Sequence, residues 1–333
     1  TQLPGLSSIA KKIAGIPQQR TIPAFAPETF QSWFARREPR NASGPRVELW
    51  PDTFNNNFFP ETARAAVEVL EDAGCFVEVP GGHVCCGRPL YDHGFLAQAR
   101  EYLLHSISVL RPHIAAGTPI VALEPSCCTV FRDELQGLFP NHPEGRKLAQ
   151  QVMTLGEFLA KKAEGYQPPQ LQRTAVLHGH CHHKSVLRMD SERKILAQMN
   201  VALRELDSGC CGMAGSFGFE QEKYEVSIAC GERVLLPEAR KAELSTVLIS
   251  DGFSCREQIS QQTDRHALHL AEVLAMAGRY GPQGPDEVVP EDVFVKPHQQ
   301  AVARSMKRAG IAAAALGVGL LAALLWKSRP KNN

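Results

Sequence analysis

Two Cys-Cys-Gly triplets constrain this chain more than any other feature, because each occupies the same place in a repeated pattern. The triplets begin at Cys85 and Cys210, which are 125 residues apart. Cys127 and Cys255, which follow later apolar segments, are 128 residues apart, and so are the first apolar segments of the two halves. Order, spacing and chemistry agree, which predicts an internal duplication.

Short apolar segments alternate with amphipathic stretches in both halves. The segments predicted as strands are VELW, FVEV and PIVAL in the first half, and TAVLHGH, VALREL and TVLIS in the second. Residues 224–235 are predicted as one long helix. Such alternation is typical of an α/β fold, here a duplicated module with mainly parallel sheets flanked by helices.

The pattern divides the chain into five parts. We expect an N-terminal connector (residues 1–45), a first module (46–168), a second module (169–280), a linker (281–308) and a transmembrane helix (309–326). The chain has no apolar leader and does not begin with Met, which indicates a fragment or a processed product.

The transmembrane prediction rests on an uncharged apolar stretch, AGIAAAALGVGLLAALLW. A membrane span needs roughly 20 apolar residues, and about 17 is the practical minimum. Basic residues flank the stretch on both sides, so they do not set its orientation. We expect a C-terminal single-pass anchor that holds the protein at the cytoplasmic side of the inner membrane; the alternative is a buried Ala/Leu helix.

Charge and cysteine content restrict the classes of function that the chain can have. The formal net charge is +1, and no basic, aromatic-rich stretch is present, so no nucleic-acid partner is expected. The ten cysteines are clustered in a chain too long for a disulfide scaffold. This pattern favours thiolates that hold a metal in a reducing compartment.

The second half offers four candidate ligands, Cys181, Cys210, Cys211 and Cys255, each in a segment that follows a predicted strand. The carboxyl ends of parallel strands meet at one edge of a sheet, so these thiols can converge. Four thiolates suit an iron–sulfur cluster or a structural zinc. Zinc more often uses short C-x2-C pairs, and none occurs here, which favours a cluster.

The first half has one thiol fewer. It keeps Cys85, Cys86 and Cys127, but Thr53 stands where the repeat would place the counterpart of Cys181. Several alternatives stay open for the metal site of the first half. It is vestigial, is completed by Asp52 or His83, binds zinc, or shares its thiolates with a cluster in the second half.

Other residues near the triplets have predicted roles. Gly87 and Gly212 let the backbone approach a bulky cofactor, and His180 and His182 are the histidines we expect to contact it. Cys75 and Cys230 lie in apolar stretches and are predicted as core thiols.

Five segments carry a family resemblance: VCCGRPLYDHG, EPSCCTVFRDEL, HGHCHHKS, DSGCCGMAGSFGFE and DGFSCREQI. They resemble the cysteine-rich (CCG) domain of the Fe–S oxidoreductases. That family includes iron–sulfur subunits of glycolate oxidase, lactate utilisation proteins and anaerobic glycerol-3-phosphate dehydrogenase, and the B-type subunit of heterodisulfide reductase. The C-terminal part of bacterial FAD-linked D-lactate/2-hydroxyacid dehydrogenases is also similar.

The resemblance implies a cofactor and partners. Cys181, Cys210, Cys211 and Cys255 would ligate a cluster, most simply of the 4Fe-4S type, and the first-half thiols a weaker duplicate site. FAD would lie on a missing part or on a partner dehydrogenase, and electrons would pass to a membrane acceptor such as a quinone. The sequence shows no ferredoxin-type cysteine run and no flavin-binding region.

Two alternatives remain from the sequence. One is a zinc-binding scaffold that docks a partner, and the other is a thiol or disulfide reductase subunit. No catalytic residue is assigned.

Overall fold

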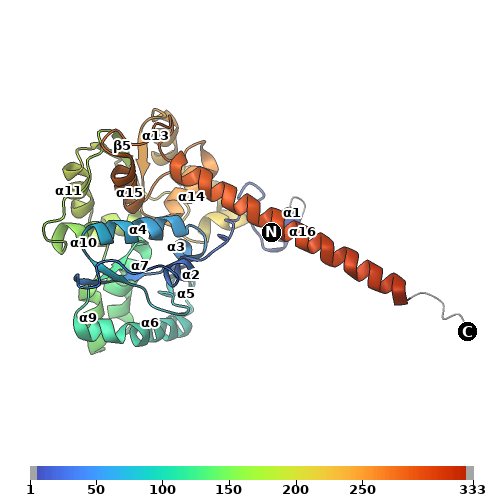
Figure 1. Ribbon diagram of the computed structural model, residues 1–333, viewed down its shortest axis with the longest axis horizontal. Coiled ribbons are helices and arrows are strands. Elements are labelled where there is room, and N and C mark those ends of the chain that lie inside the picture. Colours follow the sequence, from blue (N-terminus) through green and yellow to red (C-terminus); the bar gives the residue numbers. More distant parts are fainter. Residues whose placement is uncertain (1–5, 328–333) are drawn as a thin grey trace, which may run out of the picture.

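The computed structural model describes residues 6–327, with side chains for residues 7–310. Its described part contains two sheets in which all pairings are parallel (Figure 1). The strands are β1 (Arg46–Trp50), β2 (Phe76–Glu78), β3 (Ile120–Ala122), β4 (Val152–Met153), β5 (Thr174–Leu177), β6 (Ala202–Glu205) and β7 (Val247–Ile249). The prediction of an α/β fold with parallel sheets is confirmed.

The two sheets have the same topology. Their strand orders are β2-β1-β3-β4 and β6-β5-β7, so the first strand of each half lies inside its sheet. A parallel bridge from Ile249 to Leu268 supplies the second sheet with an edge that corresponds to β4. This shared topology supports the predicted duplication, whereas the boundaries proposed for the two modules stay a prediction.

Helices cover both faces of the first sheet. The bounds in the first half are α3 (Thr53–Asn57), α4 (Pro60–Asp72), α5 (Arg88–Asp92), α6 (Leu96–Ala116), α7 (Pro125–Thr129), η1 (Val130–Glu134), α8 (Leu135–Leu138), α9 (Pro143–Gln151) and α10 (Leu155–Lys161). Figure 1 shows α6 and α9 on the outer side of this half and α4 and α10 toward the other half. Side chains of α6 and α9 share a core with Trp50 and Ile120.

The second half also surrounds its sheet with helices. Its elements are η2 (His183–Leu187), α11 (Asp190–Gln198), η3 (Phe217–Phe219), η4 (Gln221–Lys223), α12 (Tyr224–Glu232), α13 (Leu235–Lys241), α14 (Phe253–Gln262) and α15 (Leu270–Tyr280). Before the first sheet, the predicted connector contains α1 (Leu6–Ile13) and α2 (Phe30–Phe34).

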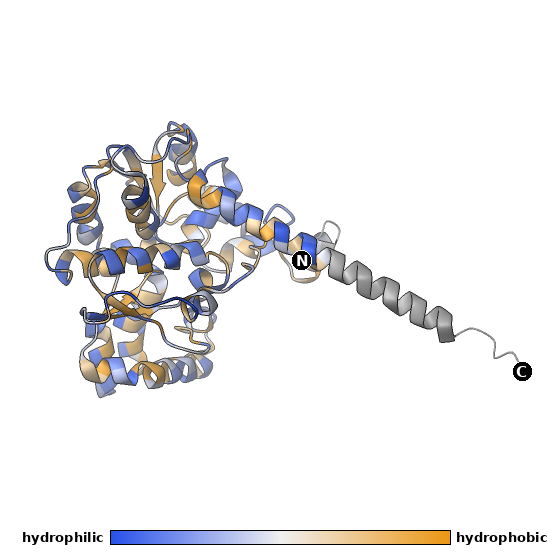
Figure 2. Cartoon of the chain, in the orientation of Figure 1, coloured by the Kyte–Doolittle hydropathy of each residue, from blue (hydrophilic) through white to orange (hydrophobic). Residues whose placement is uncertain are grey.

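One apolar core joins the two sheets. Val47 and Leu49 of β1 and Ala175 and Leu177 of β5 belong to the same buried cluster, because alternate side chains of each strand point to the same face. Helix α4 packs on α15, and α10 packs on α11, inside this layer. Figure 2 shows the strands of both sheets in hydrophobic colours and the surrounding helices in both colours.

The helix predicted over residues 224–235 is divided into α12 and α13. Val234, between them, has a non-helical backbone with φ −147° and ψ −52°. Pro237 lies in the first turn of α13 and has no N–H with which to continue the α12 hydrogen-bond series. The prediction of one continuous helix was therefore wrong.

The second part of the predicted linker is helical in the structure, which the prediction did not include. Helix α16 (Asp292–Lys327) begins inside it. Phe294 is buried in the core shared by the two sheets, so this part of the linker is docked rather than free. An ion pair between Asp292 and Lys296, one helical turn apart, accompanies the helix start.

Within the residues that the structure describes, no helix combines the length and apolar character needed to cross a membrane. Almost all of the predicted anchor, residues 309–326, lies beyond Gly310 and thus outside the residues whose side chains are described.

The shared core predicts one cooperative unfolding transition. Leu274, on α15, is 1% exposed in the core between the two sheets. We expect Leu274→Ala to lower the free energy of unfolding by about 2–5 kcal/mol, because it leaves a cavity. Urea unfolding should keep a single transition. Leu104→Ala, at a 43% exposed site on α6, is the matched control and should change stability by less than about 0.5 kcal/mol. Two separate transitions would contradict a shared core.

Candidate metal centre

Four cysteines of the second half meet at one edge of its sheet. Cys181 follows β5, Cys210 and Cys211 follow β6, and Cys255 lies in the first turn of α14 after β7. The thiols form a chain of side-chain contacts from Cys181 to Cys210, then Cys211, then Cys255. We name this group the second centre. The predicted convergence is present, whereas ligation of a metal stays a prediction.

The thiols of the second centre have pKa values that are shifted in opposite directions. The thiols of Cys181 and Cys211 and the backbone N–H of Gly212 donate to Cys210, which lowers the pKa of Cys210 to about 2. The contacts of Cys211 with Cys210 and Cys255, together with burial, raise the pKa of Cys211 well above its usual value. All four thiols must be deprotonated before four thiolates can hold a metal.

Histidines add positive potential around the same sulfurs. The Cys211 thiol and the nearby His178 and His180 side chains lower the pKa of Cys255. The His178 ring is buried and its Nδ1 lies 2.7 Å from Ser208 Oγ. An environment of imidazoles and backbone N–H groups suits a site that gathers thiolate charge.

Gly212 gives the second centre its tight backbone. Its φ of +90° is a conformation that side-chain-bearing residues rarely adopt. A Cβ there would also lie 2.0 Å from the carbonyl oxygen of Ser227. Only glycine allows the Gly212 N–H to reach Cys210 Sγ, 3.3 Å away, while α12 packs against the loop.

The first half forms a similar group with one thiol fewer, which we name the first centre. Cys86 Sγ and Cys127 Sγ are 3.1 Å apart, and Gly87 N–H donates to Cys85 Sγ at 3.5 Å. Thr53 Oγ1 lies 3.9 Å from Cys85 Sγ. Threonine thus occupies the place that a cysteine occupies in the second centre, as the spacing predicted.

The two centres differ in the side chains that lie beside their sulfurs. Buried Asp52 and Glu124 lie beside Cys127 and raise its pKa. Burial and then the neighbouring Glu124 raise the pKa of Asp52 to about 6. The residue in the corresponding position of the second centre is His180, and the two positions share a hydrogen bond. Asp52 Oδ1 accepts from the N–H two residues later, and His180 Nδ1 does the same.

The other predicted residues lie apart from the sulfurs. His83 is exposed and packs edge-on against Tyr102, so the structure favours Asp52 over His83 as a companion of the first centre. Cys75 is a buried core thiol as predicted, and Cys230 is only half-buried.

His182 joins the two halves instead of pointing only at the second centre. Its Nδ1 lies 3.1 Å from Thr129 Oγ1 of the first half, and burial lowers its pKa. Thr129 in turn accepts a hydrogen bond from Arg88, which follows the first Cys-Cys-Gly triplet. The prediction that His182 contacts a cofactor remains untested.

Sequence reasoning missed two groups of possible ligands among the described side chains. One is His183, Glu192 and Asp251, and the other is Glu48, Glu78 and His113. A signal for the second was present in the sequence, since Glu48 interrupts the apolar segment VELW.

The backbone at Gly212 yields a stability test. We expect Gly212→Ala to lower the free energy of unfolding by about 2–4 kcal/mol, because a Cβ is strained at positive φ and overlaps Ser227. Gly209→Ala is the matched control, since a Cβ there meets no atom within 4 Å. Urea unfolding of the two variants checks this, and equal stabilities would contradict the steric role of Gly212.

Comparisons with known proteins identify one cysteine-rich domain in the chain and several related proteins. The cysteine-rich domain family designated CCG matches residues 52–132. The C-type subunit of anaerobic glycerol-3-phosphate dehydrogenase from Escherichia coli (strain K12) is 27% identical over 79% of this chain and 67% of its own length. Lactate utilization protein A of Bacillus velezensis and that of Bacillus subtilis (strain 168) are each 29% identical over 69% of this chain and 98% of their own lengths. The predicted resemblance to the cysteine-rich (CCG) domain is thus confirmed: residues 52–132 match this domain, and the chain is related to a subunit of anaerobic glycerol-3-phosphate dehydrogenase and to lactate utilization protein A.

Proposed function

We propose that this protein is the iron–sulfur electron-transfer component of a flavin-linked dehydrogenase. The observation that carries the proposal is the meeting of Cys181, Cys210, Cys211 and Cys255 at one sheet edge. The names of two relatives, a dehydrogenase subunit and a lactate utilization protein, support an oxidoreductase role.

The second centre fits an iron–sulfur cluster by the chemistry of its donors. It supplies four sulfurs, and four thiolates are the usual ligand set of such clusters. When bound, a cluster of the 4Fe-4S type would supply a one-electron redox centre. His180 and Gly212 would offset the negative charge of the four thiolates, through an imidazole beside the sulfurs and a backbone N–H to Cys210.

Exposure within the second centre indicates where electrons enter or leave. Cys210 is exposed, whereas Cys211 and Cys255 are buried. Cys211 and Cys255 form the side of the site that is protected from water. Cys210 lies at the surface, where a partner can approach. In this proposal the donor is a flavin on a partner dehydrogenase or on a further part of the protein. The acceptor is a membrane component such as a quinone.

The first centre has a different role in the proposal. It lacks a fourth thiol and places two buried carboxyl groups, Asp52 and Glu124, beside Cys127. These groups disfavour a second four-thiolate cluster, because they add negative charge to an already anionic ligand set. A zinc ion held by the three thiols is the state we propose for this centre, which keeps a structural zinc role as the second candidate function.

Metal analysis of anaerobically purified protein tests the electron-transfer role. We expect about four iron atoms and matching acid-labile sulfide per chain, with an EPR signal after reduction. Cys211→Ser should lose the signal, because it removes one of the four ligands. Cys230→Ser changes a thiol outside both centres and should keep it. Zinc without iron in the wild-type protein would overturn the proposal and favour a structural scaffold.

Introducing the residues of the second centre into the first tests why the first centre would not hold an iron–sulfur cluster. The double variant Asp52→His with Thr53→Cys reproduces the residues at the corresponding positions of the second centre. We expect it to bind about four additional iron atoms per chain, because it supplies a fourth thiolate and removes one carboxylate. Asp52→His alone, which lacks the thiolate, is the control and should bind no additional iron. Unchanged iron in the double variant would show that other features exclude a cluster.

A further inference from the structure

A carboxylate is buried on the outer face of the first sheet, away from the cysteine loops. Glu48, in the middle of β1, is 0% exposed beneath α6. Neither of its carboxylate oxygens receives a hydrogen bond from any described residue. A buried carboxylate without hydrogen bonds is strongly unfavourable, so it requires a compensating charge.

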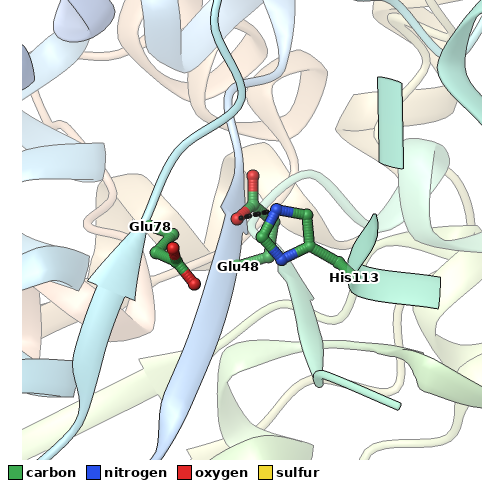
Figure 3. Close-up of side chains that lie close together, drawn as sticks. All are labelled: Glu48, Glu78 and His113. Atoms are coloured by element: carbon green, nitrogen blue, oxygen red, sulfur yellow. Dashed lines mark ion pairs between the residues drawn. The ribbon is translucent and has the colours of Figure 1, made fainter. Parts of the chain in front are cut away.

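Two further ligand-type side chains face Glu48. Glu78 of β2 is its direct neighbour in the parallel register, and His113 comes from the last turn of α6. His113 Nε2 lies 3.2 Å from Glu48 Oε2 without the alignment of a donated hydrogen bond. Figure 3 shows the imidazole and the Glu48 carboxylate facing each other, with Glu78 on the neighbouring strand. One ligand atom from each residue lies within 4.8 Å of the others.

The duplicated sheet shows that the fold itself does not require acidic residues here. In the second sheet Val176 corresponds to Glu48 and is buried among apolar side chains. Its neighbour in the register is Arg204, which pairs with Glu238 on α13. The same topology is thus built in one half with valine and arginine and in the other with two glutamates, so the glutamates need an explanation other than folding.

We propose that Glu48, Glu78 and His113 bind a divalent transition-metal ion that links β1, β2 and α6. Two carboxylates and one imidazole are a ligand set typical of Mn²⁺, Fe²⁺ or Zn²⁺. Small side-chain shifts would bring the three ligand atoms to about 2.1 Å from a common centre. Glu78 and His113 are 25% and 22% exposed at their side chains, so an ion can reach the site and keep water ligands there.

The surrounding charges agree with this assignment. Glu48 and Glu78 place two carboxyl groups side by side, and neither oxygen of the buried Glu48 carboxylate receives a hydrogen bond from a described residue. Arg46, which pairs with Glu78 from the surface, is the other charged residue at the group. A divalent ion would balance both carboxylates.

Manganese binding to the full chain tests the site, because thiolates of the cysteine centres bind Mn²⁺ weakly. Free Mn²⁺ is measured by its EPR signal during titration of metal-depleted protein. We expect about one Mn²⁺ per chain, and at least about tenfold weaker binding in Glu48→Gln and in His113→Ala. Glu61→Gln alters another Glu–His pair, that of Glu61 with His298, and should bind as the wild type does. Equal binding in wild type and Glu48→Gln would overturn the proposal.

A stability measurement distinguishes a metal site from a structural glutamate. Glu48→Val copies the residue of the second sheet. We expect this variant to be at least as stable as metal-free wild type and to show no rise in melting temperature with Mn²⁺. The wild type should show such a rise, because the ion binds only the folded state. A metal-free Glu48→Val protein that is less stable than the wild type would assign Glu48 to the fold and overturn the proposal. Neither test depends on an iron–sulfur cluster.

Discussion

The parallel arrangement of the strands is the constraint on which both cysteine centres depend. Every strand of a parallel sheet ends at the same edge, so loops separated by tens of residues open into one small region. Thr53, Cys85 and Cys127 are brought together in this way in the first half. The same geometry places the four sulfurs of the second half in contact, without any short cysteine pairing motif.

The apolar core between the sheets holds these edges in a fixed relation. Helices α4 and α15 fill it from opposite halves, and polar groups at its border connect the halves directly. Glu124 of the first half accepts a hydrogen bond from Phe253 N–H at the start of α14, 2.8 Å away. His269 Nε2 lies 3.1 Å from the carbonyl oxygen of Leu123. Both contacts lie beside strand ends, so they connect the two halves close to the cysteine centres.

Duplication supplied two sites, and a few substitutions gave them different chemistry. Asp52 and His180 occupy corresponding positions and make the same local hydrogen bond, yet one adds negative charge and the other an imidazole. Thr53 replaces a thiol with a hydroxyl, which is a poor ligand for soft metals. Away from the cysteine loops, Glu48 and Val176 show the same divergence on the outer faces of the sheets. The second half thus serves as an internal reference for every unusual residue of the first.

Six of the seven described strands, the parallel character of the sheets and the meeting of the four thiols were predictable from the sequence, whereas β4 was not. Hydrophobic periodicity, the spacing of motifs and turn residues are properties of the sequence itself, so they can be analysed without a structure. The sequence analysis did not predict the division between α12 and α13, where Pro237 interrupts the hydrogen bonds of a continuous helix. It also did not place Glu48 beside His113, because these residues lie on different elements that meet only when α6 packs on the sheet. The charge around each centre could not be predicted from the sequence, because it depends on distances between side chains that packing brings together.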